Sequence, residues 1–271
     1  ELMATGSNLI NTSANGQPSD NEDRPFSFAI GTQIFLNPSD DPTSAVVSFK
    51  VDASLLAGSL AAGTSNLSIG LSADSELNTL SNWGESFIST ASPNRFPVGF
   101  GRLTNAPNQI GVNVEGSQVA TISKPSTVAA IDIASNAMSI TGHSFSTGDR
   151  VVVSSTGTVP GGLAVSTGYF VISSSANSIK LATTRASAVA GSEIDLQSAG
   201  SGTITVASDE IFTLTRTGSS GSVTLKKADL TVATFTNLNV NSPLRLFYWN
   251  REQSASSTDP VLKEIKVTGA I

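Results

Sequence analysis

The sequence predicts an all-β protein, an antiparallel β-sandwich that carries an inserted small β-barrel-like module. Three observations predict this class. Hydrophobic residues recur at every second position over most of the chain, which is the period of a strand with one buried face. Turn-forming residues separate these runs, as at Asn15-Gly16 and Pro160-Gly161-Gly162. Residues 124–206 differ in texture, with few charges and many Ser, Thr, Gly and Ala residues.

The strands of the first half are predicted from runs with one apolar face, in which β-branched residues suit the pleat. Their inward residues are Phe26, Phe28, Ile30, Thr32, Ile34 and Leu36 in the first run, Val47, Phe49 and Val51 in the second, and Ile110, Val112 and Val114 in the third. Helical signal is thin, because glycines limit it. We expect only a turn or two at Ala53–Ala62 and another at Leu77–Trp83.

The strands of the last part follow the same rule, with short polar turns between them. Residues that share one face are Phe212 and Leu214, Val223 and Leu225, Leu230 and Val232, and Leu244, Leu246 and Tyr248, while Ile265 and Val267 are expected inward within Val261–Thr268. Alternation places Phe247 and Trp249 on the opposite face from Leu246 and Tyr248.

The middle segment is predicted to be a unit of its own. Its strands are expected at Met138–Ile140, Arg150–Val153, Tyr169–Ile172, Ser178–Leu181, Ile194–Leu196 and Thr203–Val206. Its flanks, Gln118–Ile122 and Glu210–Arg216, are expected to be two strands of one sheet, with the module inserted in the hairpin between them. The predicted organisation is an extended arm (1–24), a discontinuous sandwich (25–123 plus 207–271) and the module (124–206).

A family resemblance lies in this middle segment. It is carried, in order, by Thr141–Val153 with its Gly148-Asp149 turn, Ser154–Leu163 with Pro160-Gly161-Gly162, Tyr169–Ile172, Ile179–Thr183 and Ile194–Leu196. This order resembles a small β-module that recurs in tailed-bacteriophage structural proteins, especially tail fibres and other appendages. The resemblance implies a virion component whose partners are other tail or capsid proteins. It also implies self-association, with a homotrimer as the family's habit, and contact with host cell-surface glycan.

The outer part is similar in pattern to concanavalin-like jelly-roll sandwiches. The similarity is carried by the succession 210–216, 222–228 and 230–235, and by a final strand, 263–268, expected to return beside the first. The resemblance implies a fold that binds glycans, cleaves them, or only builds structure, so that it does not fix function.

The sequence predicts no enzyme, no catalytic residues and no cofactor. The chain has no Cys and a single His143, which excludes Cys/His zinc sites and thiol nucleophiles. The Glu-x-Asp-x-x-Glu pattern of sandwich glucanases is absent. Asp209 and Glu210 are neighbours, expected on opposite faces of a strand, and we interpret them as a solvated hairpin edge. Gly99-Phe100-Gly101 lacks the rest of a phosphate loop and is interpreted as a strand bend.

The candidate glycan-binding residues are Trp83, Trp249 and Arg251, because aromatic platforms are the usual sugar contact in sandwich folds. The alternative is that both tryptophans pack in the core or against another subunit. No metal site is predicted. The acidic loops Asp20-Asn21-Glu22-Asp23 and Asp40-Asp41 are interpreted as hydrated, with structural calcium as the alternative.

The charge and hydropathy of the chain argue against two classes of partner, nucleic acid and the membrane interior. The net charge is −6, which argues against a nucleic-acid groove, and no apolar run approaches the roughly 18 residues of a membrane span. Together with these exclusions, the resemblance of the middle segment implies a non-enzymatic virion structural protein, a tail fibre or appendage that displays a host-attachment surface. Two alternatives stay open. One is a capsid decoration or head-fibre protein, and the other is a concanavalin-like lectin or glycan hydrolase.

Overall fold

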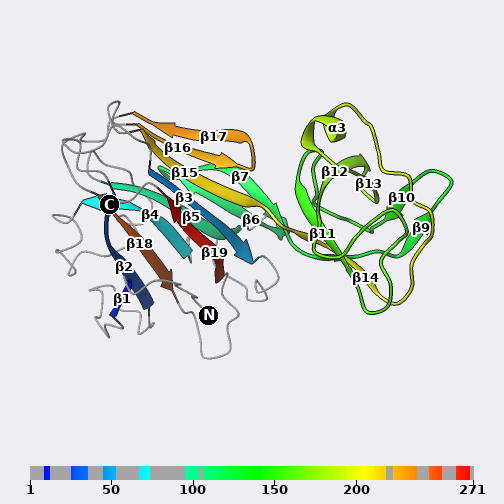
Figure 1. Cartoon of the computed structure of the whole chain (residues 1–271), viewed down its shortest axis with the longest axis horizontal. Helices are drawn as coiled ribbons and strands as arrows, with labels where there is room; N and C mark the ends of the chain where they lie inside the picture. Colours follow the sequence, from blue (N-terminus) through cyan, green and yellow to red (C-terminus); the bar gives the residue numbers. More distant parts are fainter. Residues whose placement is uncertain are drawn as a thin grey trace. The chain divides into compact units, whose positions relative to one another are not determined.

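The computed structural model describes residues 9–12, 26–35, 45–52, 67–73, 95–103, 106–217, 222–236, 244–251 and 261–268. These residues form three antiparallel sheets and one short helix, which confirms the all-β class (Figure 1). The helical turns expected at 53–62 and 77–83 lie outside the described residues. The chain divides into two compact units. We call Ile122–Glu210 the module, and the strands before and after it the flanking unit.

The larger sheet of the flanking unit has seven strands and is called sheet A. Four residues of the predicted arm form its edge strand, where Leu9 pairs with Gly31. At the other edge, Glu115 and Gly116 both have positive φ (53° and 72°), as a two-residue hairpin turn requires. In spatial order the strands are β1 (Leu9–Thr12), β2 (Phe26–Phe35), β18 (Leu244–Arg251), β4 (Leu67–Ala73), β5 (Arg95–Leu103), β6 (Ala106–Val114) and β7 (Ser117–Ser123).

The smaller sheet of the flanking unit, sheet B, has five strands. In spatial order they are β17 (Leu230–Phe235), β16 (Ser222–Lys227), β15 (Ile211–Thr217), β3 (Ala45–Asp52) and β19 (Val261–Thr268). Two expectations about strand neighbours are wrong. The strands that flank the module, β7 and β15, belong to different sheets, and β19 lies beside β3. Alternation fixes which face of a strand is buried, but it does not specify the neighbouring strand.

Phenylalanine side chains join the two sheets in the core of the flanking unit. Phe49 of β3 stacks on Phe212 of β15, with ring centroids 5.7 Å apart. Phe100 of sheet A meets both edge-on, at 6.0 Å from Phe49 and 5.6 Å from Phe212. All three rings are completely buried. For Phe49 and Phe212, the alternation of the sequence predicted this. Such T-shaped and stacked pairs stabilise a core beyond the area that they bury.

Sheet A is covered on both faces around β18. Leu246 and Phe247 are adjacent in this strand and are both buried, at 7% and 0% exposure. Gly70 of β4 pairs with Phe247, and a Cβ added there would lie 2.8 Å from the Phe247 ring and would overlap the Phe96 carbonyl. The ring therefore lies over a glycine that leaves it room. Gly99 and Gly101 lie within the paired length of β5, opposite Asn113 and Gly111 of β6.

The final strand shows a change of phase that the sequence did not predict. Leu262 is 1% exposed, whereas Ile265, expected to point inward, is half-buried. Between them Glu264 has a φ of 53°, so the regular alternation is broken at this residue. Leu230, at the start of β17, lies on the same side of the sheet as its partner, the buried Lys227, but is itself 49% exposed.

The module contains a seven-stranded sheet. Its two edge strands, Ser126–Thr127 and Ala130–Asp132, are consecutive in the chain, and they pair with different neighbours at opposite sides of the sheet. Between these pairings, Val128 N–H donates to the Ile204 carbonyl (2.9 Å) and Ala129 N–H to the Ser139 carbonyl (2.8 Å). In spatial order the strands are β8 (Ser126–Thr127), β14 (Ile204–Ser208), β11 (Arg150–Ser155), β12 (Gly168–Ser175), β13 (Ser178–Ala182), β10 (Ala137–Ser139) and β9 (Ala130–Asp132).

The module has its own hydrophobic core and one helix that the sequence did not predict. The helix α3 (Arg185–Val189) begins after Thr184, whose side chain accepts a hydrogen bond from Ser187 N–H. Ile194–Leu196, expected as a strand, is not one. Its amides bond instead to the Leu181 carbonyl and to a side-chain amide. The core residues are Met138, Ile140, Phe145, Val151, Val153, Tyr169, Val171, Ile179, Leu181, Leu196, Ile204 and Val206.

Replacing Gly70 with alanine is expected to lower the free energy of unfolding by about 1–3 kcal/mol, because the new methyl group displaces the Phe247 ring. Chemical denaturation of the whole chain measures this loss. Gly116→Asn is the matched control, since its turn is open and asparagine tolerates positive φ. Equal stability of Gly70→Ala and the parent chain would contradict the packing described here.

Candidate functional site

The tryptophans predicted to contact glycan are only partly placed by the structure. Trp83 lies outside the described residues. Trp249 and Arg251 lie in β18, where the backbone of Trp249 pairs with Phe28 and with Ser68. Their side chains are outside what the structure describes, so the glycan platform stays a prediction. The acidic loops 20–23 and 40–41 also lie outside the described residues.

The Gly148-Asp149 turn is held by hydrogen bonds of its own. Asp149 is 7% exposed, and its Oδ2 accepts a hydrogen bond from Ser146 N–H at 2.9 Å. Gly148 has a φ of 91° and donates its N–H to the Val171 carbonyl at 2.8 Å, while Val171 N–H donates to the Asp149 carbonyl at 2.9 Å. The carboxylate therefore stabilises a tight turn just before β11.

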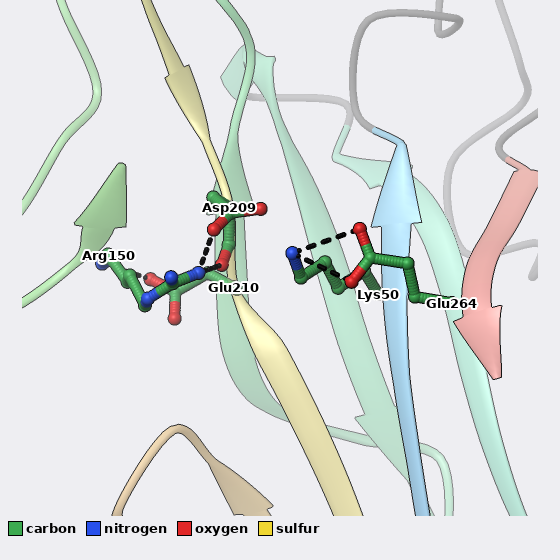
Figure 2. Close-up of polar contacts among 5 residues, drawn as sticks. All are labelled: Lys50, Arg150, Asp209, Glu210 and Glu264. Carbon is green, nitrogen blue, oxygen red and sulfur yellow. Dashed lines mark hydrogen bonds and ion pairs between the residues drawn. The ribbon is translucent and has the colours of Figure 1, made fainter. Parts of the chain in front are cut away.

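Arg150, the next residue, is the centre of a partly buried polar cluster (Figure 2). Its Nη1 donates to the Asp209 carbonyl at 2.6 Å and forms an ion pair with the Asp209 carboxylate. Its main-chain N–H donates to Glu210 Oε1 at 2.7 Å, and Glu210 is 3% exposed. A Cβ at Gly168 would overlap the guanidinium, so this glycine leaves the space that Arg150 occupies.

Asp209 and Glu210 therefore have a structural role at the end of the module. They lie in the link between β14 and β15, and Glu210 is buried, so the interpretation of this pair as a solvated hairpin edge is wrong. Both carboxylates bind Arg150: that of Asp209 binds the Arg150 side chain, and that of Glu210 binds the Arg150 main-chain N–H. A carboxylate that accepts these bonds fixes the chain where it leaves the module.

Hydroxyl groups join two loops of the module without any charged residue. Ser155 Oγ donates to the Ser201 carbonyl, and Thr158 N–H donates to Ser201 Oγ at 3.1 Å. Thr203 N–H donates to Thr156 Oγ1 at 2.9 Å. The abundance of Ser and Thr in this segment thus has a local explanation, since their side chains satisfy loop amides.

Two exposed carboxylates of the module have lowered pKa values. The Ser135 hydroxyl donates to Asp132 Oδ2 at 2.6 Å and is the main cause of the lowered pKa of Asp132. Lys180 Nζ lies 3.0 Å from Glu193 Oε1, and this hydrogen bond is the main cause of the lowered pKa of Glu193. Each carboxylate is thus stabilised in its charged form by a neighbour in the same module.

His143 lies beside Phe145, a residue of the module's hydrophobic core. Both ring nitrogens are buried and have no hydrogen-bond partner within the part of the chain that is described, and the ring lies 6.0 Å from that of Phe145. In the same part of the chain, no group of three or more His, Cys, Asp or Glu residues could hold a metal ion. Nor does any helix there have the length and apolar character needed to cross a membrane.

The polar cluster of the module was missed from the sequence. Arg150 stands 59 positions before Asp209, and no local pattern links them. Asn136, whose Oδ1 accepts a hydrogen bond from Leu196 N–H at 2.8 Å, was missed for the same reason. The available signal was a Gly-Asp-Arg triplet directly before a valine run, because charged residues at the start of a buried strand need partners.

Comparison with known proteins adds no family to this description, since no protein-family model and no curated protein matches the chain.

Arg150→Ala is expected to lower the free energy of unfolding of the module by about 2–3 kcal/mol, because Asp209 keeps a largely buried charge without its partner. Chemical denaturation measures the loss. Lys180→Ala is the matched control, because it removes an ion pair whose carboxylate is exposed, and its effect should be much smaller. Equal losses for the two variants would show that the Arg150 cluster has no special role.

Ser135→Ala is expected to raise the pKa of Asp132 toward its ordinary value, because the main hydrogen bond to the charged form is lost. The stabilisation from this carboxylate is present above its ordinary pKa and is lost as the pH falls through the lowered value. NMR titration of the side-chain carboxyl carbons measures the pKa of Asp132 in the parent chain and in the variant. Glu193 is the internal control. Its titration should not change in Ser135→Ala and should move upward in Lys180→Ala.

Proposed function

We propose that this chain is a non-enzymatic structural protein of a bacteriophage virion, a tail fibre or other appendage component that displays a host-attachment surface. Its partners would be other virion proteins and further copies of the same chain. The proposal rests on the resemblance of residues 124–206 to a phage structural module, together with the role that the resembling residues have in the structure.

The observation that carries the proposal is that these resembling residues serve the backbone of the module. Asp149 closes a turn, and Gly162 has a φ of 91° next to the Asp195 carbonyl. The Tyr169 hydroxyl accepts a hydrogen bond from Ala164 N–H at 2.7 Å, and Lys180 pairs with Glu193. A sequence pattern whose members hold turns and strands together favours a building unit over a reaction site.

A surface with few unpaired charges, as in this module, suits weak contacts with glycan at the protein surface. Charged residues make up 13% of the chain, about half the usual share, and the described charged side chains of the module largely pair with one another or with the backbone. Weak glycan contacts of this kind gain strength by repetition, since linked sites reach an avidity about 10²–10⁴ times that of one site. Trp83, Trp249 and Arg251 are the proposed contact residues.

The finer architecture is also part of this proposal. The segment Ser126–Asp132 supplies both edge strands of the module sheet, β8 and β9, which supports a small closed barrel. Sheets A and B meet through Phe49, Phe100 and Phe212, which supports a jelly-roll-like sandwich in the flanking unit.

Gold-labelled antibodies against the recombinant chain, applied to purified phage particles that encode it, test the proposal. Label on the tail or its fibres is expected. Antibodies depleted on the recombinant chain are the control and should leave the particles unlabelled.

Two other results would overturn the proposal. Label spread over the capsid lattice would replace attachment with the decoration role, and intact particles without label would remove the chain from the virion. Release of reducing sugars from host polysaccharide by the purified chain would contradict the non-enzymatic part and favour the glycan hydrolase.

A further inference from the structure

The two edges of sheet B differ in how they meet solvent. At one edge, β19 carries Lys263, Glu264 and Lys266, and the backbone of Glu264 is left-handed. Glu264 also forms an ion pair with Lys50 of β3, with Nζ 3.0 Å from Oε2 (Figure 2). Charges and irregular backbone on an edge strand prevent another strand from pairing with it.

The opposite edge, β17, has none of these charges. Its sequence is Leu-Thr-Val-Ala-Thr-Phe, without charged residues or proline. Leu230 is 49% exposed, and Thr231 and Thr234 are also exposed, whereas Phe235 is anchored in the core beside Phe96, with ring centroids 5.8 Å apart. An uncharged, β-branched edge that is accessible to solvent can accept a further strand.

A register shift in β17 gives this edge an unusual symmetry. Lys226 of β16 pairs with Thr231 and the preceding Leu225 with Ala233, so Val232 is an extra residue. The shift places Leu230 and Phe235 on the same, core-facing side of the sheet, because they pair with Lys227 and Val223, which are both inward and buried. Without the extra residue, positions five apart would face opposite sides.

We propose that β17 is a self-association edge, on which the β17 strand of a second copy of this chain pairs antiparallel about a two-fold axis. With the axis between Val232 and Ala233, Leu230 lies opposite Phe235 of the second copy, and Thr231 opposite Thr234. Residues that lie opposite each other must share a face, and the extra residue satisfies this condition for both pairs. Thr–Thr and aromatic–aliphatic pairs are favourable across strands.

This inference rests on the self-association included in the proposed function and names the surface that performs it. The two can fail separately. The pairing is measured in solution with the purified chain, whereas the virion location is measured on particles. A single pair of edge strands buries little surface, so we expect a weak dimer that becomes effective when other contacts hold the copies together.

Cysteine cross-linking tests the pairing and its register, because the chain contains no cysteine of its own. Thr231→Cys and Thr234→Cys proteins are mixed and oxidised. Directly opposite Cβ atoms lie about 5 Å apart, close enough for a disulfide. Two copies of the same residue in this register would be about 10 Å apart, too far to bond. The mixture is therefore expected to give a covalent dimer that neither protein gives alone.

Gln118→Cys, an exposed position on the edge strand of sheet A, is the matched control and should not cross-link with either variant. Cross-linking of the mixture no greater than that of the Gln118→Cys control would overturn the proposal. So would equal cross-linking of Thr231→Cys alone, because this result would indicate collision without register.

A charge on the edge gives an independent measurement. Thr231→Lys is expected to raise the dimer dissociation constant in sedimentation velocity about tenfold or more, because two like charges are then held about 10 Å apart on one face of the paired strands. Gln118→Lys should leave the constant unchanged. Circular dichroism confirms that both variants remain folded. A parent chain that stays monomeric from micromolar to millimolar concentration would overturn the proposal.

Discussion

The pairing of β3 with β15 is the constraint on which the flanking unit depends. These central strands of sheet B lie on opposite sides of the module in the sequence, yet they pair over six positions, from Ala45–Arg216 to Lys50–Ile211. The stacked rings of Phe49 and Phe212 come from this pair, and Phe100 joins it to sheet A. Pairings of such long range form slowly, since the loop between them must first be closed.

Polar groups have different uses in the two units. In the module, carboxylates and hydroxyls accept or donate bonds that hold turns and loops, as Asp149 does for Ser146 and Thr156 for Thr203. In sheet B, Arg216 is completely buried at an inward position of β15, and desolvation lowers its pKa. A guanidinium buried in this way is costly unless it is paired, in contrast to the exposed polar groups of the module loops.

The sequence was informative wherever alternation alone decides the outcome. Val47 and Phe49, or Ile110 and Val112, were predicted inward and are buried, because one face of each strand meets the core. Partners at long range were not predictable. The neighbour of β15, and the bond between Arg150 and Asp209, depend on how distant segments meet in space. Of the candidate glycan residues, only the strand positions of Trp249 and Arg251 are described.

The position of the two strands that begin and end the module has an evolutionary consequence. Ser126 pairs with Val206, so the chain arrives at and departs from the module at neighbouring points of one sheet. A unit connected in this way can be exchanged for another by two recombination events. The distance between the two points where the flanking unit connects to it then stays the same. A lineage carrying this architecture could therefore acquire new surfaces as ready-made cassettes, while the sheets that bear them are inherited unchanged.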